Sequence, residues 1–216
     1  MEQIGSVKCN MIMKVSLQHV TEYDIKDASS NDCKRLQKQE GNVSKIYYTP
    51  FLILHLMGQK GREILEIDVK EVIDDLNSAY ADEWLAHFQY FLFAQVIEGI
   101  DAETLKKELE KQSMDEMNHA KIIGDRIIQL GGTPTTKLTE TSSCGFSPPP
   151  EDRTDLVRVV ELVLNGERCA IEKYNKLAKK YHMKDLVTHE IFEDLLTDEV
   201  SDEEDWESFL PGLQQR

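Results

Sequence analysis

Hydrophobic residues recur at spacings of three and four along most of the chain after residue 60, which is the period of an amphipathic helix. The pattern predicts four long helices, over residues 69–97, 101–130, 156–181 and 185–209. Asp101 and Asp185 stand where helix N-caps are expected, and Gly131-Gly132 ends the second stripe. Residues 131–153, "GGTPTTKLTETSSCGFSPPPEDR", form a long connection between the second and third helices. We therefore expect an all-α protein, a four-helix bundle with one long crossover.

The first 60 residues show neither helical nor strand periodicity. They contain short polar stretches broken by "DASSND", "QEGN" and "YTP". We interpret residues 1–60 as a poorly patterned N-terminal extension and residues 61–216 as the folded domain. Because Met57 stands just before the regular pattern, a further hypothesis is that the first 56 residues are dispensable or that translation begins at Met57. Loss of folding or assembly in a chain expressed from Met57 would contradict this hypothesis.

The charge of the chain indicates which ligands and partners it can bind. The formal net charge is -15 at pH 7, so a nucleic acid or an anionic membrane would be repelled and cations are the expected ligands. The longest apolar run, Phe51 to Met57, is far shorter than the roughly 20 residues of a membrane span. No secretory signal pattern is visible at the N-terminus. We therefore expect a cytoplasmic protein that binds neither nucleic acid nor membrane.

Acidic residues interrupt the hydrophobic stripe of every predicted helix. The polar residues that stand in apolar positions are Glu83 in the first helix, Glu116 and His119 in the second, Glu167 in the third, and Glu199 and Asp202 in the fourth. A lone ionised Glu in a bundle core would cost several kcal/mol. Two divalent metal ions would neutralise four converging carboxylates, and this explains why each helix carries one. Glu116 and His119, three positions apart, share one helix face.

The chain also resembles a helical hairpin used twice. "EWLAHFQY" places Glu83 seven residues before Tyr90, and "ERCAIEKY" places Glu167 seven residues before Tyr174. "DEMNH" in the second helix corresponds to "DEVSD" in the fourth. Di-iron carboxylate bundles use one Glu from each of two helices and Glu-x-x-His from each of the other two. Tyr90 and Tyr174 are packing residues in the simplest interpretation, although each phenol could hydrogen-bond a ligating carboxylate on the facing helix.

Several segments resemble the Dps-like, or thioferritin, branch of the ferritin-like superfamily: "GREILEIDVKEVIDDLNSAYADEWLAHFQY", "QLGGTP", "CGF" and "NGERCAIEKYNKL". The resemblance covers about residues 61–210 and implies a ferritin-like four-helix bundle. Proteins of this branch form hollow dodecamers, oxidise Fe(II) with hydrogen peroxide at an intrasubunit dimetal centre and store ferric iron. Carried onto this chain, the family's ligands are Glu83, Glu116, His119, Glu167 and Glu199.

The sixth ligand position departs from the family pattern, because Asp202 stands where the family has His. A carboxylate is a harder and more negative ligand than imidazole, so manganese becomes a rival to the two iron ions that the resemblance implies for each subunit. Glu203, one residue on, could serve in place of Asp202. The alternative for Glu199 and Asp202 is an exposed acidic helix face, because both lie in the run "TDEVSDEED".

The resemblance also maps the family's cysteine pair onto Cys144 and Cys169 and implies a redox-active disulfide near the metal centre. On a helical wheel Cys169 lies about 200° from Glu167, so it does not share the ligand face. Two buried free thiols remain the alternative to a disulfide. We read Cys9 and Cys33 as incidental.

The function that these features predict is that of a Dps-like ferroxidase, which oxidises Fe(II), preferably with hydrogen peroxide, and stores iron in a homo-oligomeric cage, protecting against oxidative stress. One alternative keeps the fold and changes the chemistry to a manganese catalase or a rubrerythrin-like peroxidase. The chain lacks the pair of C-x-x-C motifs that a rubredoxin-like site would need. A second alternative is a non-catalytic helical bundle that binds metal only structurally.

Overall fold

The computed structural model describes residues 58–215. The predicted extension therefore lies outside the described residues except for positions 58–60, as do Met57, Cys9 and Cys33. The described part contains no strand, and its helices are α3 Gln59–Glu63, α4 Val69–Val96, α5 Ala102–Gln129, α6 Leu138–Thr141, α7 Leu156–Tyr181 and α8 Leu186–Gln214. The four long helices match the predicted ones closely, except that α8 continues past residue 209 and includes Pro211.

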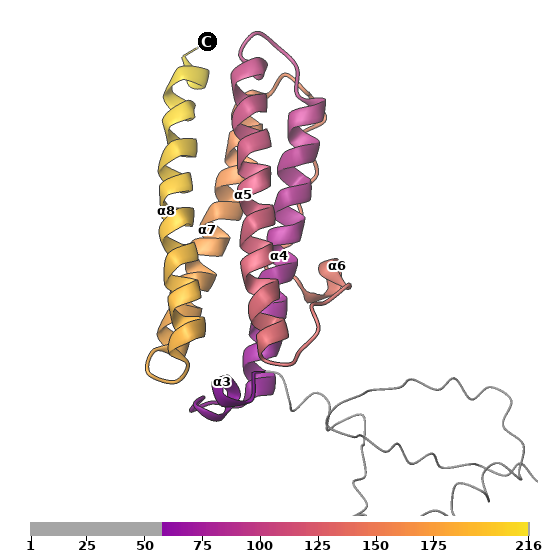
Figure 1. The fold of residues 1–216 in the computed structure, drawn as a ribbon. Coiled ribbons are helices and arrows are strands. Elements are labelled where there is room, and N and C mark those ends of the chain that lie inside the picture. The colour runs from indigo at the N-terminus through magenta and orange to yellow at the C-terminus, as the bar shows by residue number, and fades with distance from the viewer. Residues whose placement is uncertain (1–57, 216) are drawn as a thin grey trace, which may run out of the picture. The chain divides into compact units, whose positions relative to one another are not determined.

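The four long helices form two antiparallel hairpins joined by the crossover (Figure 1). α4 packs chiefly on α5, and α7 packs chiefly on α8. The crossover runs back along the bundle, so that α5 and α7 point in the same direction. This arrangement confirms the predicted all-α bundle with one long crossover. The one-turn helix α6 lies within that crossover and was not predicted, because four residues are too few to establish a hydrophobic period.

Side-chain and backbone caps fix the ends of these helices. Asp185 caps α8 as predicted, because its carboxylate accepts a hydrogen bond from the Thr188 amide at 3.2 Å. Asp68 and Asp155 cap α4 and α7 in the same way. Gly131 ends α5 with a φ of 83°, a conformation that glycine adopts without strain. These caps set where each long helix begins and ends, and hence which residues face the bundle interior.

The apolar core consists of two clusters. One includes Phe93, Leu109, Val163 and Trp206, and the other includes Leu76, Ile123, Tyr174 and Phe192. On each long helix the residues of the two clusters are separated by a short polar segment. These segments contain the buried carboxylates Glu83, Glu116, Glu167 and Glu199. The bundle therefore places one polar layer between two hydrophobic cores.

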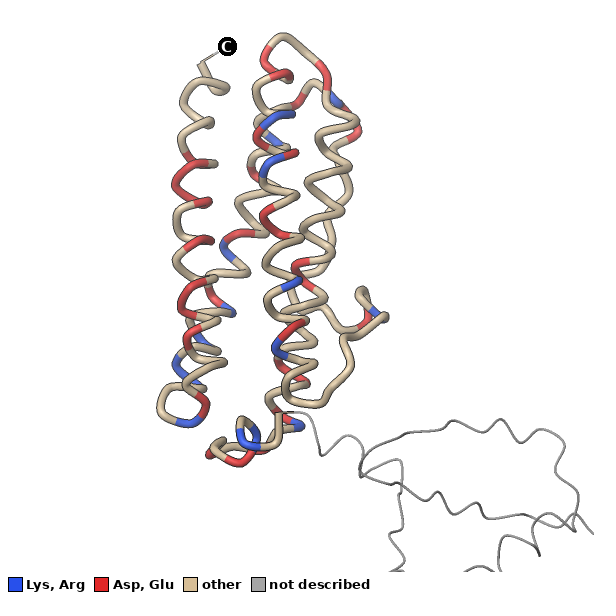
Figure 2. The backbone as a smooth tube through the Cα atoms, viewed as in Figure 1, with Lys and Arg blue, Asp and Glu red and all other residues tan. Residues whose placement is uncertain are grey.

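Asp and Glu residues are concentrated on α8 (Figure 2). This helix carries ten Asp and Glu residues and no Lys or Arg. Such a charge distribution creates a negative potential that attracts cations to this side of the bundle. None of the described helices combines the length and the apolar character that crossing a bilayer requires.

Candidate metal centre

Four of the predicted ligands meet in the polar layer. Glu83 comes from α4, Glu116 and His119 from α5, and Glu199 from α8, and one potential ligand atom from each lies within 4.8 Å of those of the others. All four residues are at most 3% exposed. His119 Nδ1 lies 3.6 Å from Glu83 Oε2, 3.5 Å from Glu116 Oε2 and 3.3 Å from Glu199 Oε1. One imidazole nitrogen therefore faces three carboxylates.

Three atoms of this group have no hydrogen-bond partner. Within the described part of the chain, Glu83 Oε2, His119 Nδ1 and Glu199 Oε1 are buried and unpartnered. Buried polar atoms of native proteins are nearly always satisfied, and an unpaired one costs about 1–3 kcal/mol or more. A cation between these atoms would satisfy all three. Carboxylate and imidazole donors suit iron and manganese, so the residues present fit the predicted metal centre.

Glu167 on α7 lies beside this group. It is 1% exposed, and its Oε1 accepts a hydrogen bond from the Tyr90 hydroxyl at 2.7 Å. This bond confirms that the Tyr90 phenol reaches a carboxylate on the facing helix. Glu167 also lines a cavity of about 80 Å³ together with Glu83, Glu116 and Glu199. The carboxylates of all four long helices therefore reach one region, as the interrupted stripes predict.

A glycine allows the Tyr90 hydroxyl to approach. A Cβ at Gly166 would lie 2.9 Å from the Tyr90 hydroxyl oxygen, which is closer than real contacts allow. The corresponding tyrosine of the second hairpin behaves differently. Among residues 58–215 the buried Tyr174 hydroxyl has no hydrogen-bond partner, and the ring packs on Phe192 with centroids 5.6 Å apart. For Tyr174 the structure therefore shows packing only.

Asp202 is not part of the group that the structure brings together. Its Oδ2 accepts a hydrogen bond from Gln112 Nε2 at 2.8 Å, and the same nitrogen lies 3.2 Å from Glu116 Oε1. Asp202 instead lines an outer cavity of about 270 Å³. The other residues of that cavity are Asp115, Asn118, His119, Asp198 and Ser201. Glu203, the alternative sixth ligand, pairs with Arg168 on α7 at 2.7 Å.

Gln112 is the residue of this site that the sequence pattern did not single out. It is buried in α5 and connects Glu116 to Asp202 through one amide nitrogen. The available signal was weak: a glutamine in an apolar position, one helical turn before Glu116. An amide that holds a ligating carboxylate is a common outer partner of metal ligands.

The carboxylates share protons because they are buried close together. Burial, followed by repulsion from Glu116, raises the pKa of Glu83 and Glu167 well above the ordinary value and that of Glu199 to about 7. Burial also acts on Glu116, but its interactions with the nearby His119 and Glu83 outweigh it and lower its pKa. Burial opposes the charged form of His119, yet attraction to the three carboxylates around its Nδ1 raises its pKa. Metal binding at this centre must therefore displace protons.

The structure contains the disulfide that the resemblance implies. Cys144 in the crossover is bonded to Cys169 on α7, with Cα atoms 5.8 Å apart. Cys144 also lines the 80 Å³ cavity that Glu83 and Glu167 line. Both cysteines of the described part are therefore paired, and the alternative of two free thiols is wrong for this structure.

Comparisons with known proteins were made by sequence and by structure. A family model described as a ferritin-like domain matches residues 73–215. The chain is 26% identical over 162 residues to a DNA protection during starvation protein of Pyrococcus furiosus, an alignment that covers 72% of this chain and 87% of that protein. It is 31% identical over 131 residues to a bacterioferritin of Rhodobacter capsulatus, covering 60% of this chain and 76% of that protein.

Comparison with solved structures also finds similarity to ferritin-related proteins. A dodecameric thioferritin of Bacteroides fragilis, a bacterioferritin-related protein, superposes with a TM-score of 0.69 and 34% identity, over 73% of this chain and 95% of that chain. The bacterioferritin of Desulfovibrio desulfuricans, whose diiron site has been described in different catalytic states, superposes with a TM-score of 0.58 and 26% identity. That alignment covers 68% of this chain and 82% of the bacterioferritin.

Proposed function

The chain belongs to the ferritin-like family, and on this premise we propose that it is a ferroxidase that oxidises Fe(II) at the buried carboxylate centre and stores the ferric product in a cage of identical subunits. One observation carries the proposal: carboxylates from all four long helices and one imidazole reach one layer, where three potential ligand atoms have no partner among the described residues. A hydrogen-bonded structural cluster would not leave these atoms unsatisfied.

The residues have distinct roles toward two Fe(II) ions, which are the substrate. Glu83, Glu116 and His119 would hold one ion, and Glu167 and Glu199 would hold the other. Each Fe(II) supplies one electron, and hydrogen peroxide accepts two electrons and two protons to give two waters. The ionised carboxylates favour Fe(III) over Fe(II), because they stabilise the higher charge more strongly. Tyr90 and Gln112 hold Glu167 and Glu116 in place through their hydrogen bonds.

We propose hydrogen peroxide as the preferred oxidant and a cage as the assembly, and the cage is supported by likeness and by the surface of the bundle. The similar thioferritin of Bacteroides fragilis is dodecameric, and we propose the same assembly here. Phe88 and Phe91 are 52% and 46% exposed on one face of α4, and such aromatic residues are suited to a subunit contact. The net charge of -15 opposes DNA binding, so we do not extend that property of Dps proteins to this chain.

A second candidate function is a manganese catalase-like activity. The observation that favours it is the position of Asp202, because the α7–α8 half of the centre contributes carboxylates and no imidazole. An all-oxygen ligand set is harder and suits manganese better than iron. The two candidates differ in their products: a ferroxidase consumes peroxide in proportion to iron, whereas a catalase releases oxygen over many turnovers.

The test is an anaerobic titration with Fe(II) followed by hydrogen peroxide. We expect Fe(II) binding to saturate at about two ions per chain, with one peroxide consumed for every two ions. Glu83→Gln should lose this fast oxidation. Glu204→Gln, an exposed change on α8, is the matched control and should retain it. Continuous oxygen release would favour the catalase, and wild-type kinetics in Glu83→Gln would contradict both assignments.

The cage requires a separate measurement. Light scattering of the purified full chain should give a mass of about twelve times the 24.8 kDa of one chain. A monomer at micromolar concentration would contradict the cage without affecting the assignment of the metal centre.

A further inference from the structure

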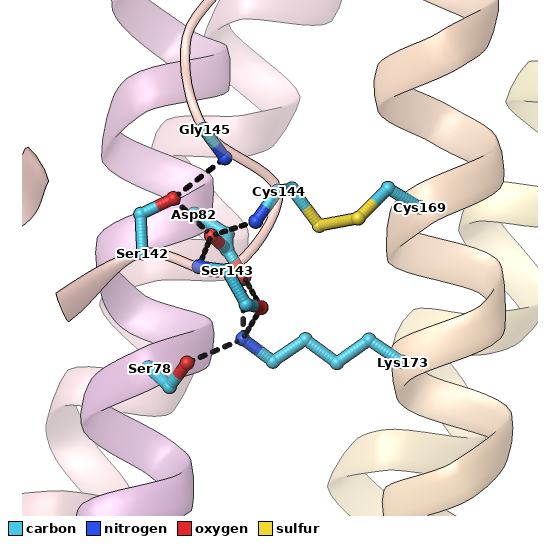
Figure 3. Close-up of polar contacts among 8 residues, drawn as sticks. All are labelled: Ser78, Asp82, Ser142, Ser143, Cys144, Gly145, Cys169 and Lys173. Atoms are coloured by element: carbon cyan, nitrogen blue, oxygen red, sulfur yellow. Dashed lines mark hydrogen bonds and ion pairs between the residues drawn. A yellow bond between two sulfur atoms is a disulfide. The ribbon is translucent and has the colours of Figure 1, made fainter.

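One carboxylate beside the metal centre collects hydrogen bonds from the crossover (Figure 3). Asp82, next to Glu83 in α4, is only 7% exposed. Its Oδ1 accepts from the Ser142 hydroxyl at 2.5 Å and from the amides of Ser143 and Cys144 at 2.8 and 3.0 Å. Its Oδ2 accepts from the Ser143 hydroxyl at 3.0 Å. The segment that carries Cys144 is therefore folded around Asp82.

Lys173 joins α7 to the same group. Its Nζ forms an ion pair with Asp82 and donates to the hydroxyls of Ser78 at 2.9 Å and Ser143 at 3.0 Å. Lys173 follows Cys169 by four residues, so both side chains leave α7 on the same face. Figure 3 shows the disulfide and the lysine side by side, both directed from α7 toward the crossover segment.

The folded segment owes this conformation to contacts that do not involve sulfur. The Ser142 hydroxyl also accepts from the Gly145 amide at 2.8 Å, and Gly145 has a φ of +79°, which closes the turn. Further along, the Ser147 amide donates to the side-chain oxygen Oε1 of the buried Gln89 at 2.6 Å. Side chains of α4 therefore hold the segment at two places, independently of the disulfide to α7.

The charge on Asp82 makes this attachment strong. The Lys173 ammonium forms an ion pair with this carboxylate, and the Ser142 hydroxyl and the amides of Ser143 and Cys144 donate to it. Hydrogen bonds to an ionised acceptor are about twice as strong as those between neutral groups.

The equilibrium between a disulfide and its two thiols depends on how closely the reduced cysteines are held together. Without contacts to α4, Cys144 would be tied to α7 only through residues 145–155 of the crossover and would sample many separations from Cys169. The contacts of Asp82 fix the segment within reach of α7, where the two Cα atoms are 5.8 Å apart. These contacts remain available after both sulfurs are reduced.

We propose that Asp82 is a positioning residue for a thiol–disulfide couple: it keeps Cys144 beside Cys169 in the reduced chain, so that the bond opens and closes without the crossover leaving the metal-centre cavity. This role goes beyond the proposed ferroxidase function and does not depend on it. Because Cys144 lines the cavity shared with Glu83 and Glu167, this cysteine remains part of the cavity wall in both states.

The test is the equilibrium of the metal-free full chain with a small dithiol such as dithiothreitol. Two electrons and two protons pass from the dithiol to the protein disulfide, giving two protein thiols and the cyclic disulfide of the reagent. The experiment uses a background with Cys9→Ser and Cys33→Ser, so that only Cys144 and Cys169 report, and alkylation followed by mass spectrometry gives the reduced fraction.

We expect Asp82→Ala to shift this equilibrium toward the thiols by about tenfold, which corresponds to a reduction potential about 30 mV less negative. Asp82→Asn should give a smaller shift, because the amide keeps one acceptor oxygen but loses the ion pair with Lys173. Glu140→Ala is the matched control: it removes the exposed Lys137–Glu140 ion pair in the same crossover and should change the equilibrium less than twofold.

An equilibrium in Asp82→Ala within twofold of the unmodified background would overturn the proposal. Should Asp82→Ala lose its helical circular dichroism, Ser143→Ala removes a donor while Asp82 stays in place, and it should still shift the equilibrium toward the thiols. No shift in a folded Ser143→Ala would then overturn the proposal equally. A purely structural Asp82 would lower the melting temperature without changing the potential. Because no metal is present, failure of the ferroxidase assignment cannot affect the result.

Discussion

The two helical hairpins use the same sequence pattern but build unequal halves of the metal centre. In α4 and α5, Glu83, Glu116 and His119 form a compact group. In α7 and α8, Glu199 joins that group, whereas Asp202 turns to Gln112. The repeated spacing therefore sets where the carboxylates stand, and the residue three positions after the second Glu decides whether that half also contributes a nitrogen.

The tyrosines show the same inequality. Tyr90 on α4 donates to Glu167 on α7, whereas the equivalent hydroxyl of Tyr174 has no partner. Glu83 occupies the position in the first hairpin that Glu167 occupies in the second. Among the described residues, its Oε2 also has no hydrogen-bond partner. Of the two equivalent tyrosine–glutamate contacts between the hairpins, the hydrogen bond from Tyr90 to Glu167 is formed, and the one from Tyr174 to Glu83 is not. Glu83 Oε2 lies 3.6 Å from His119 Nδ1, and the proposed metal ion would supply the missing partner at this point.

Removing one carboxylate from either half should have the largest effect. We expect Glu116→Ala and Glu167→Ala each to slow Fe(II) oxidation by at least about 100-fold, because several kcal/mol of charge stabilisation are lost. The helices should remain folded, because the two hydrophobic clusters on either side of the layer are untouched. Stopped-flow oxidation and circular dichroism measure the two quantities. Oxidation at the wild-type rate in either variant would remove that half from the centre.

The second effect is a pH dependence of the free energy of unfolding. It should have opposite signs for Glu116 and Glu199, the equivalent residues of the two hairpins. The pKa of Glu199 is raised to about 7 in the folded chain, above its ordinary value of 4.5. Its contribution to stability is therefore fully present below about pH 4.5 and is lost as the pH rises through about 7. Relative to Glu199→Gln, the metal-free wild type should lose about 1–3 kcal/mol of unfolding free energy between pH 4.5 and 8.

Urea unfolding at several pH values provides this comparison. Glu116→Gln is the contrasting variant: the lowered pKa of Glu116 predicts that its contribution is lost as the pH falls, the opposite direction to Glu199. Parallel pH profiles for wild type and Glu199→Gln would contradict the proton sharing inferred for this centre.

Making the two halves alike should have a moderate effect. Asp202→His restores the nitrogen ligand of the family pattern, and we expect the weaker of two Fe(II) sites to bind about tenfold more tightly. Anaerobic competition with a chromophoric chelator measures the two affinities. An unchanged weaker affinity would mean that position 202 does not reach the metal in either form.

The smallest effect concerns the packing that places Tyr90 on Glu167. Gly166→Ala adds a Cβ 2.9 Å from the Tyr90 hydroxyl oxygen, and we expect a loss of about 1 kcal/mol in unfolding free energy. Gly61→Ala is the matched control, because a Cβ there meets nothing within 4 Å. Chemical denaturation of both variants gives the comparison. Equal stability of the two would show that Tyr90 moves aside without cost.

The helices and most of the centre could be predicted because they depend on local periodicity. An interrupted stripe identifies Glu83 or Glu167 without knowledge of the neighbouring helix, since a carboxylate in an apolar position must face the interior. The pairing of Asp202 with Gln112 could not be predicted, because the two residues are 90 positions apart and their contact depends on how α5 and α8 pack. The attachment of the crossover to Asp82 was missed for the same reason: next to Glu83, this residue resembles an ordinary surface acid in the sequence.

The most direct test of the account is to locate metal in crystals of the full chain grown anaerobically with Fe(II), using anomalous scattering at the iron edge. We predict two iron ions among Glu83, Glu116, His119, Glu167 and Glu199, in the layer between the two hydrophobic clusters. Iron found only in the outer acidic cavity around Asp115 and Asp198, or no ordered iron in the bundle interior, would contradict a buried dimetal centre.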